Sequence, residues 1–223
     1  MRSGTDTRQL ERTFTEAGRR AQIVQAAIET IAEVGFARAS LARIGERIGV
    51  SKGLIGYHFA GKDELIRQVV SEILEQGKAY MLPRILAEPP GPDMLRAYIE
   101  SNLGFMREHP SYMLAIAEIK RNGLTADGRQ LFYGVADMDG FARELADSLA
   151  TLQAGGHLRL DFDPYPMAIA IRAAIDVVPR HLVDPDFNID IYARQVARLF
   201  DLATRPEETS REPADRGLEG TAP

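Results

Sequence analysis

Six polar side chains that can bind nucleic acid lie within one short stretch of the chain. The six are Ser40, Ser51, Lys52, Tyr57, His58 and Lys62. Hydroxyl, ammonium and imidazole groups donate hydrogen bonds to phosphate oxygens, and a long lysine side chain also reaches the edges of bases. The chain contains no nucleophile elbow, P-loop or dinucleotide fingerprint, so we expect neither an enzyme nor a bound cofactor. The pattern therefore favours binding over catalysis.

The residues between these donors predict two short helices that hold them in place. We expect helices over residues 40–48 and 51–59. Gly45 leaves room where the second helix crosses the first, and Gly49 tolerates the positive φ that the turn requires. Ser40 and Ser51 can cap the two helices. Four aliphatic side chains would lock the pair together: Ile44, Ile48, Val50 and Ile55. This pattern is typical of a helix-turn-helix, in which the second helix enters the major groove of DNA.

The rest of the chain also predicts helices. Apolar residues recur at helical spacing, as Ile23, Ala27, Ile31 and Val34 do in a helix over residues 15–34, and no clear strand alternation occurs. Further helices are expected over residues 62–81, 92–109, 111–121, 126–153, 164–181 and 188–203, with Ser111 as a cap. The predicted fold class is therefore all-α.

Composition and charge narrow the class of protein. The chain has 223 residues, 45% of them hydrophobic, and no cysteine. Its net charge is −5, yet residues 1–66 carry 10 Lys/Arg and 8 Asp/Glu, against 17 and 24 in the remainder. Phosphate contacts need local positive charge, so this asymmetry favours a DNA-binding head on an acidic body. No apolar run reaches the length of a membrane span, and the four histidines lack ligand spacing, so we expect a cytoplasmic protein without a metal site.

The run GVSKGLIGYHFAGKDEL, residues 49–65, together with Ile44 and Gly45, resembles the TetR family of bacterial regulators. The resemblance covers about residues 15–66, which is under a third of the chain. It implies a DNA-binding domain of three helices at the N-terminus and a helical C-terminal domain that binds a ligand and forms a homodimer. One position departs from the family: Gly56 stands where many members carry a tyrosine.

The resemblance implies a specific set of DNA contacts. Residues at the start of the recognition helix would approach bases, while the others would bind the phosphate backbone, with Arg43 as an additional contact. The implied set is Ser40, Arg43, Ser51, Lys52, Gly53, Leu54, Tyr57, His58 and Lys62.

Apolar and aromatic residues of the C-terminal half suggest where a mostly apolar small molecule would bind. The candidates are Phe105, Met106, Met113, Ile116, Phe132, Tyr133 and Met167. Each is also an ordinary core residue type, and methionine adapts to irregular ligands. The last two helices resemble the family's dimer-forming pair, with candidate interface residues Ile169, Ala173, Ile191, Gln195 and Leu199.

These observations predict four segments: a disordered arm over residues 1–14, the DNA-binding domain over 15–66, the ligand-binding and dimerisation domain over 67–204, and a disordered tail over 205–223. The expected function is that of a ligand-responsive repressor, released from a palindromic operator by a small molecule. Two alternatives stay open. One is a helical enzyme or carrier that only retains a similar hairpin, and the other is a DNA-binding activator without ligand control.

Overall fold

The computed structural model describes residues 4–125, 127–132, 138–182 and 184–206. Within these ranges the chain forms helices and one isolated bridge between Leu124 and Gln130, so the all-α prediction is confirmed. The helices are α1 (Gly4–Val34), α2 (Leu41–Arg47), α3 (Lys52–His58), α4 (Lys62–Leu86), α5 (Pro92–Glu108), α6 (Pro110–Asn122), α7 (Met138–Ala154), α8 (Pro164–Asp176), the short 3₁₀ helix η1 (Val178–Arg180) and α9 (Ile189–Thr204).

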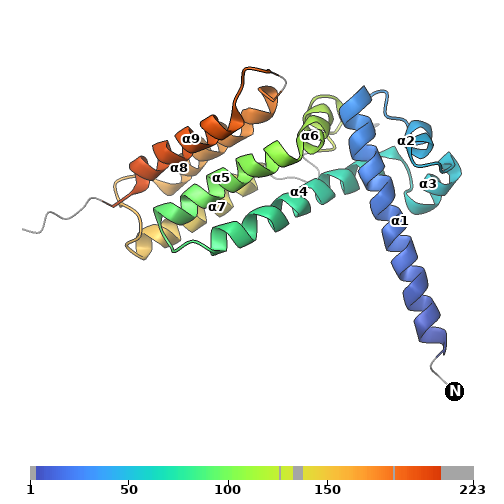
Figure 1. Cartoon of the computed structure of the whole chain (residues 1–223), viewed down its shortest axis with the longest axis horizontal. Coiled ribbons are helices and arrows are strands. Elements are labelled where there is room, and N and C mark those ends of the chain that lie inside the picture. The colour runs from blue at the N-terminus through green and yellow to red at the C-terminus, as the bar shows by residue number, and fades with distance from the viewer. Residues whose placement is uncertain (1–3, 126, 133–137, 183, 207–223) are drawn as a thin grey trace, which may run out of the picture.

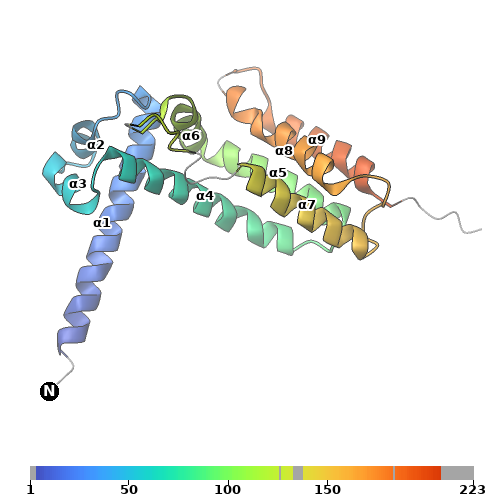
Figure 2. The same ribbon diagram turned by 180° about the vertical axis from the view of Figure 1, so that it is seen from behind.

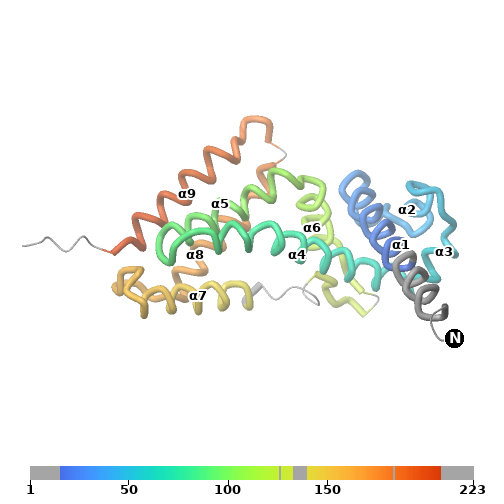
Figure 3. Tube along the Cα trace, turned by 60° about the horizontal axis from the view of Figure 1, so that its bottom comes forward, coloured from blue at the N-terminus to red at the C-terminus, as the bar shows by residue number. Residues whose placement is uncertain are grey.

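Helices α1, α2 and α3 form a head at one end of an elongated molecule, and α5, α7, α8 and α9 form a body at the other (Figure 1). Helix α4 starts in the head and runs along the body, as the view from behind also shows (Figure 2). Helix α6 stands at the junction, where it packs against α1 and α4 on one side and against α5 and η1 on the other (Figure 3). The predicted boundary at residues 66 and 67 therefore falls inside one continuous helix.

One apolar core runs through both parts. In the head, Ile23, Ile44, Ile55 and Phe59 are almost completely buried, and the same cluster continues through α4 to residues such as Ile99 in the body. Burial of such side chains supplies most of the folding free energy. A shared core also means that a shift of α4 is felt in both parts, because close-packed interiors transmit strain.

Two helices are longer than the sequence predicted. Helix α1 begins at Gly4, although we expected a disordered arm over residues 1–14; residues 5–17 contain no proline or glycine that would break a helix. Helix α4 continues beyond Met81, through Pro83, to Leu86. Proline removes one backbone hydrogen bond from the helix, the one to the Ala79 carbonyl. The next residue, Arg84, donates from its guanidinium to the Tyr80 carbonyl of the same turn.

Two predictions, one for the start of α6 and one for the segment that follows it, were wrong. Ser111 does not cap this helix, because the helix begins one residue earlier at Pro110, which suits the first helical turn. The long helix expected over 126–153 starts only at Met138. Residues 123–125 and 127–132 instead form turns and the bridge between Leu124 and Gln130, and Leu131 N–H donates to the Gly123 carbonyl at 2.8 Å. The predicted disordered tail lies, from residue 207 onward, outside the described residues.

Candidate nucleic-acid interface

Two glycines make the sharp crossing of α2 and α3 possible. A Cβ atom on Gly45 would lie 2.5 Å from the Val50 carbonyl oxygen, which is closer than real Cβ contacts allow. The Val50 N–H donates to the Gly45 carbonyl at 2.9 Å, and Gly49 between them has φ +69°. Glycine adopts this backbone conformation without strain. The roles predicted for both residues are thus confirmed.

Serine hydroxyls cap both helices of the motif, as predicted. Ser40 Oγ accepts from Arg43 N–H at 3.2 Å, and Ser51 Oγ accepts from Leu54 N–H at 3.2 Å. Each hydroxyl acts here as an acceptor, so its own proton remains available to a phosphate oxygen. The caps therefore fix the helix starts and leave a donor at each.

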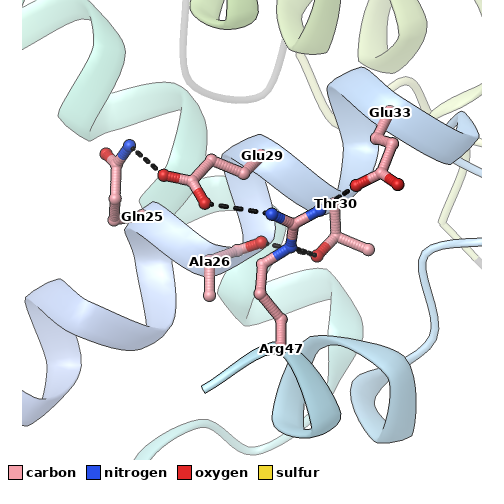
Figure 4. A network of polar contacts seen from close by, with 6 residues as sticks. All are labelled: Gln25, Ala26, Glu29, Thr30, Glu33 and Arg47. Carbon is pink, nitrogen blue, oxygen red and sulfur yellow. Dashed lines mark hydrogen bonds and ion pairs between the residues drawn. The ribbon is translucent and has the colours of Figure 1, made fainter.

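A polar network fastens α2 to α1 and thereby sets the orientation of the motif (Figure 4). The Arg47 guanidinium donates to Thr30 Oγ1 at 3.1 Å and to Glu29 Oε2 at 3.2 Å, and it also pairs with Glu33. Thr30 in turn donates to the Ala26 carbonyl at 2.7 Å. Because all the partners of Arg47 lie on α1, this side chain supports the motif and is not free to bind DNA.

Helix α3 buries one face and exposes the other. Ile55 is fully buried, whereas Ser51, Lys52 and Gly53 at its start are exposed, and the Tyr57 side chain is 70% exposed. Leu54 and His58 are half-buried, and Arg43 is exposed on α2. The predicted DNA contacts of α3 therefore lie on the side of this short helix that faces away from the core, and most of them are at its N-terminal end.

Tyr57 and His58 already have partners within the head. The Tyr57 hydroxyl donates to Glu16 Oε1 at 3.3 Å, and its ring meets the His58 ring edge-on, with 5.1 Å between the ring centres. The His58 carbonyl accepts from the Arg20 guanidinium. A long, exposed hydrogen bond such as that to Glu16 is weak, so Tyr57 can exchange it for a phosphate.

Lys62 differs from the other predicted contacts, because its ammonium group is occupied inside the protein. Its Nζ donates to the Phe36 carbonyl at 2.6 Å and lies 4.1 Å from the centre of the Phe36 ring. Burial lowers the pKa of this amine, against a smaller opposing effect of Asp63. Lys62 thus joins the start of α4 to the α1–α2 turn.

The same turn is held from the body by a residue that sequence reasoning did not place there. Phe36 N–H donates to Glu118 Oε2 of α6 at 3.1 Å. Gly35 next to it has φ +82°, and a Cβ atom there would lie 3.0 Å from the same carboxylate oxygen. Both backbone groups of Phe36 are therefore bonded, its N–H to α6 and its carbonyl to α4. Phe36 and Glu118 are 82 positions apart in the sequence, which leaves no local signal for this contact.

The residues predicted to line a ligand cavity mostly lie in the core of the body. Phe105, Met106, Met113 and Phe132 are buried, Ile116 and Met167 are half-buried, and Tyr133 lies outside the described residues.

Two of the hollows in the described part of the chain are well formed, and neither is lined by any of the predicted cavity residues. The larger hollow, of about 470 Å³, is an open groove between α4, α5 and α9. Its charged residues are three arginines and three acids, namely Arg84, Arg107, Arg194, Glu88, Glu100 and Asp190.

The residues predicted to form a dimer interface are all exposed in the single chain. Ile169 is 48% exposed, Ile191 51% and Leu199 61%, and Ala173 and Gln195 are also exposed. They lie on α8 and α9, together with exposed Tyr165 and Leu202. Two adjacent helices thus present a set of uncovered large apolar side chains.

The described residues include no group of three or more metal-ligating side chains, and none of their helices is long and apolar enough to cross a membrane.

Residues 23–69, which contain the motif, match the model of the bacterial regulatory proteins of the tetR family.

Curated proteins and solved structures extend this match. The chain is 41% identical over 85 residues to the HTH-type transcriptional regulator BetI 1 of Chromohalobacter salexigens, which covers 38% of this chain and 42% of that protein. It is 30% identical over 149 residues to the regulator BetI of Cronobacter sakazakii, covering 62% of this chain and 73% of that relative. The fold matches the transcriptional regulator FadR of Bacillus subtilis, solved with stearoyl-CoA, at a TM-score of 0.68 and 20% identity, over 80% of this chain and 96% of that one.

The match to several BetI relatives spans only about two fifths of their length. The Cronobacter relative, however, is matched over 73% of its length, and the FadR structure has a similar fold over 80% of this chain. The relatives are named transcriptional regulators, which sets aside the helical-enzyme alternative. With the helix-turn-helix geometry in place, the chain belongs to the TetR family of transcriptional regulators.

Proposed function

We propose that this regulator is a homodimeric repressor that binds a palindromic operator through α3 and is released from it by a small molecule. The observation that carries the proposal is the exposed end of α3, where Ser51, Lys52 and Gly53 stand free of the head. Helix-turn-helix proteins contact base edges with this end of the second helix. Arg43, Ser40 and Tyr57 flank it and would bind phosphates.

The uncovered apolar face of α8 and α9 supports the homodimer. Isolated apolar side chains are normal on a protein surface, but a cluster on two neighbouring helices indicates an interface. A second copy would cover it with the same residues, and the two-fold axis would place two α3 helices on the two halves of a palindrome. We therefore expect the full chain to sediment as a dimer.

The junction at Phe36 supports control by a ligand. Helices α4 and α6 both extend from the body to the α1–α2 turn, where Lys62 and Glu118 bind the two backbone groups of Phe36. A ligand that shifts either helix in the body would change how the head is held. A coupling free energy of about 1–3 kcal/mol is enough to change operator occupancy substantially.

The effector itself is proposed to be a mostly apolar small molecule. The interior of the body offers aromatic and thioether side chains, such as Phe105, Met106 and Met113. Such side chains adapt to ligands of irregular shape. The FadR relative of similar fold was solved with stearoyl-CoA, a ligand that contains a long apolar chain.

The test is operator binding by the full-length protein and its Lys52→Ala variant. DNA flanking the chain's own gene is footprinted first, and affinity for the protected segment is then measured at several salt concentrations. Loss of a base contact should weaken binding by roughly 1–3 kcal/mol, and loss of a phosphate contact should reduce the salt slope by about 1. Lys78→Ala is the matched control, because Lys78 is exposed on α4 of the body.

If Lys52→Ala bound the operator with unchanged affinity and an unchanged salt slope, the assignment of α3 to the DNA interface would be wrong. Activation of transcription on operator binding would favour the activator alternative. A protected segment that lacks two-fold symmetry would contradict the palindromic operator.

A further inference from the structure

A buried arginine occupies the place where α5 and α8 meet. The Arg172 side chain is only 16% exposed. It donates from Nη1 to the Tyr98 hydroxyl at 3.0 Å and from Nη2 to Asp176 Oδ1 at 2.5 Å. Its Nε is buried and has no hydrogen-bond partner. A buried guanidinium donor without an acceptor is costly, so this atom marks a place where an acceptor is missing.

A second cation, Lys120 of α6, faces the same region. Its Nζ lies 4.4 Å from the centre of the Phe132 ring. Among the described residues it has no hydrogen-bond acceptor and no carboxylate within 4 Å. Burial is the largest influence on its pKa and lowers it. A partly buried ammonium group loses part of its hydration, which a negative charge nearby would compensate.

The charges around Lys120 do not balance. After burial, the largest influence on its pKa is Asp176, which raises it, while Arg172 and Arg180 each lower it by a smaller amount. Three cations thus share one carboxylate, which is itself bonded to Arg172. The open groove between α4, α5 and α9 shows the opposite arrangement, because its three arginines face three acids and Arg107 is paired with Asp190. The surplus of positive charge is therefore particular to the interior cluster.

We propose that Lys120 and Arg172 bind the anionic group of a small molecule, a carboxylate or a phosphate, with Lys120 Nζ and Arg172 Nε as donors. This inference rests on the proposed function and defines the effector as an amphiphilic anion. Charge-assisted hydrogen bonds of this kind are short and strong in a partly buried site. The apolar part would lie among the surrounding aromatic side chains, of which Phe132 is next to Lys120 and Phe141 is 5.8 Å from the Arg172 guanidinium carbon.

The position of Lys120 gives such an anion a route to the head. Lys120 and Glu118 are two residues apart on α6, so their side chains point to nearly opposite sides of the helix. Glu118 binds Phe36 of the head, whereas Lys120 faces α8 and η1 of the body. An anion that draws Lys120 and Arg172 together would therefore act on α6, the helix that holds the α1–α2 turn.

The experiment is thermal unfolding of the full chain with matched probes at constant ionic strength. Straight-chain carboxylates from acetate to decanoate are compared with alkyl phosphates and with alcohols of the same chain lengths. Lys120→Met removes the charge at similar size, Lys120→Arg keeps the charge, and Lys78→Met is the surface control. Lys120→Gln replaces Lys120→Met if that variant does not fold.

We expect one of the two anion series, but not the alcohols, to raise the unfolding temperature of the wild type. The series that gives the larger rise distinguishes a carboxylate from a phosphate ligand. In Lys120→Met this binding should be weakened by roughly tenfold or more, whereas Lys120→Arg and Lys78→Met retain it. Without ligand, Lys120→Met should be no less stable than the wild type, because an uncompensated charge has been removed.

Two results would overturn the inference. One is an alcohol series that stabilises the wild type as well as both anion series do, and the other is undiminished anion binding in Lys120→Met or Lys120→Gln. The measurement needs no DNA, so it is independent of the proposed function. Operator binding without any anion effect would refute this inference alone. An anion effect at Lys120 without operator binding would refute the proposed function alone.

Discussion

The side chains proposed to bind DNA in the head come from one stretch of sequence, residues 40–58. The proposed anion site instead combines Lys120 of α6 with Arg172 of α8, which is held by Tyr98 of α5. In the head, neighbouring residues decide the geometry: Gly45 and Gly49 set the crossing, and Ser40 and Ser51 cap the helices. In the body, the geometry depends on how distant helices pack. A local change should therefore break the head, and only a change at a long-range contact should disturb the link between the two parts.

The largest effect is expected from Gly45→Ala. Alanine favours helices, but its Cβ would lie 2.5 Å from the Val50 carbonyl oxygen, so α3 has to move away from α2. Overpacking of this kind costs about 1–3 kcal/mol. Operator affinity should fall by more than that of Lys52→Ala, because every contact of α3 is displaced. Urea unfolding and fluorescence anisotropy with operator DNA measure the two effects.

An intact operator affinity in Gly45→Ala would show that the head tolerates a wider crossing and that its geometry is less local than the glycine contacts indicate. Gly56→Ala is a suitable comparison in α3, since no atom lies within 4 Å of a Cβ atom there and Gly56 is not among the proposed DNA contacts.

An intermediate effect is expected at the contact between body and head. Glu118→Ala leaves Phe36 N–H without its acceptor, at a cost of about 1–2 kcal/mol for a part-buried charged hydrogen bond. Hydrogen exchange at the Phe36 amide should become roughly 5–30 times faster. Glu118→Gln keeps an amide oxygen as acceptor and should retain most of the protection.

Equal exchange at Phe36 in the wild type and in Glu118→Ala would mean that α6 does not hold the turn. The route from Lys120 to the head would then be excluded, although anion binding at Lys120 would be unaffected.

The smallest effect, and the only favourable one, is expected from Gly56→Ala. No atom lies within 4 Å of a Cβ atom at Gly56, so the substitution costs no contact. Alanine in place of glycine stabilises a helix interior by roughly 0.5–1 kcal/mol. The midpoint of urea unfolding should rise, with operator affinity nearly unchanged. A loss of stability would reveal that α3 needs the flexibility of glycine.

The motif could be predicted from the sequence because its rules act over a few residues. A small residue, a glycine turn and two hydroxyl caps occur at fixed spacing between Ser40 and Ser51, and each was found where it was expected. Lys62 shows the limit of this reasoning. Its place at the start of α4 was predicted correctly, but its Nζ binds the Phe36 carbonyl inside the protein, 26 residues away in sequence.

The cluster in the body could not be predicted in the same way. Arg172 and Asp176 are four residues apart on one helix and read as an ordinary surface ion pair. Nothing local shows that Arg172 also meets Tyr98, 74 residues earlier, or that Lys120 lies nearby. The prediction of a long helix from residue 126 was wrong for a related reason. The turns that precede α7 are held by contacts with α6, such as the hydrogen bond that Gln130 Nε2 donates to the Lys120 carbonyl.

The open space at Gly56 has a consequence for the evolution of relatives of this regulator. A Cβ atom can be introduced there by mutation without rebuilding the motif, because the position is exposed and no atom lies within 4 Å of that Cβ. A duplicated copy of the gene could therefore change the exposed surface of α3 through one substitution, while the packing of the motif is inherited unchanged. Position 56 is where we would expect such lineages to diverge first.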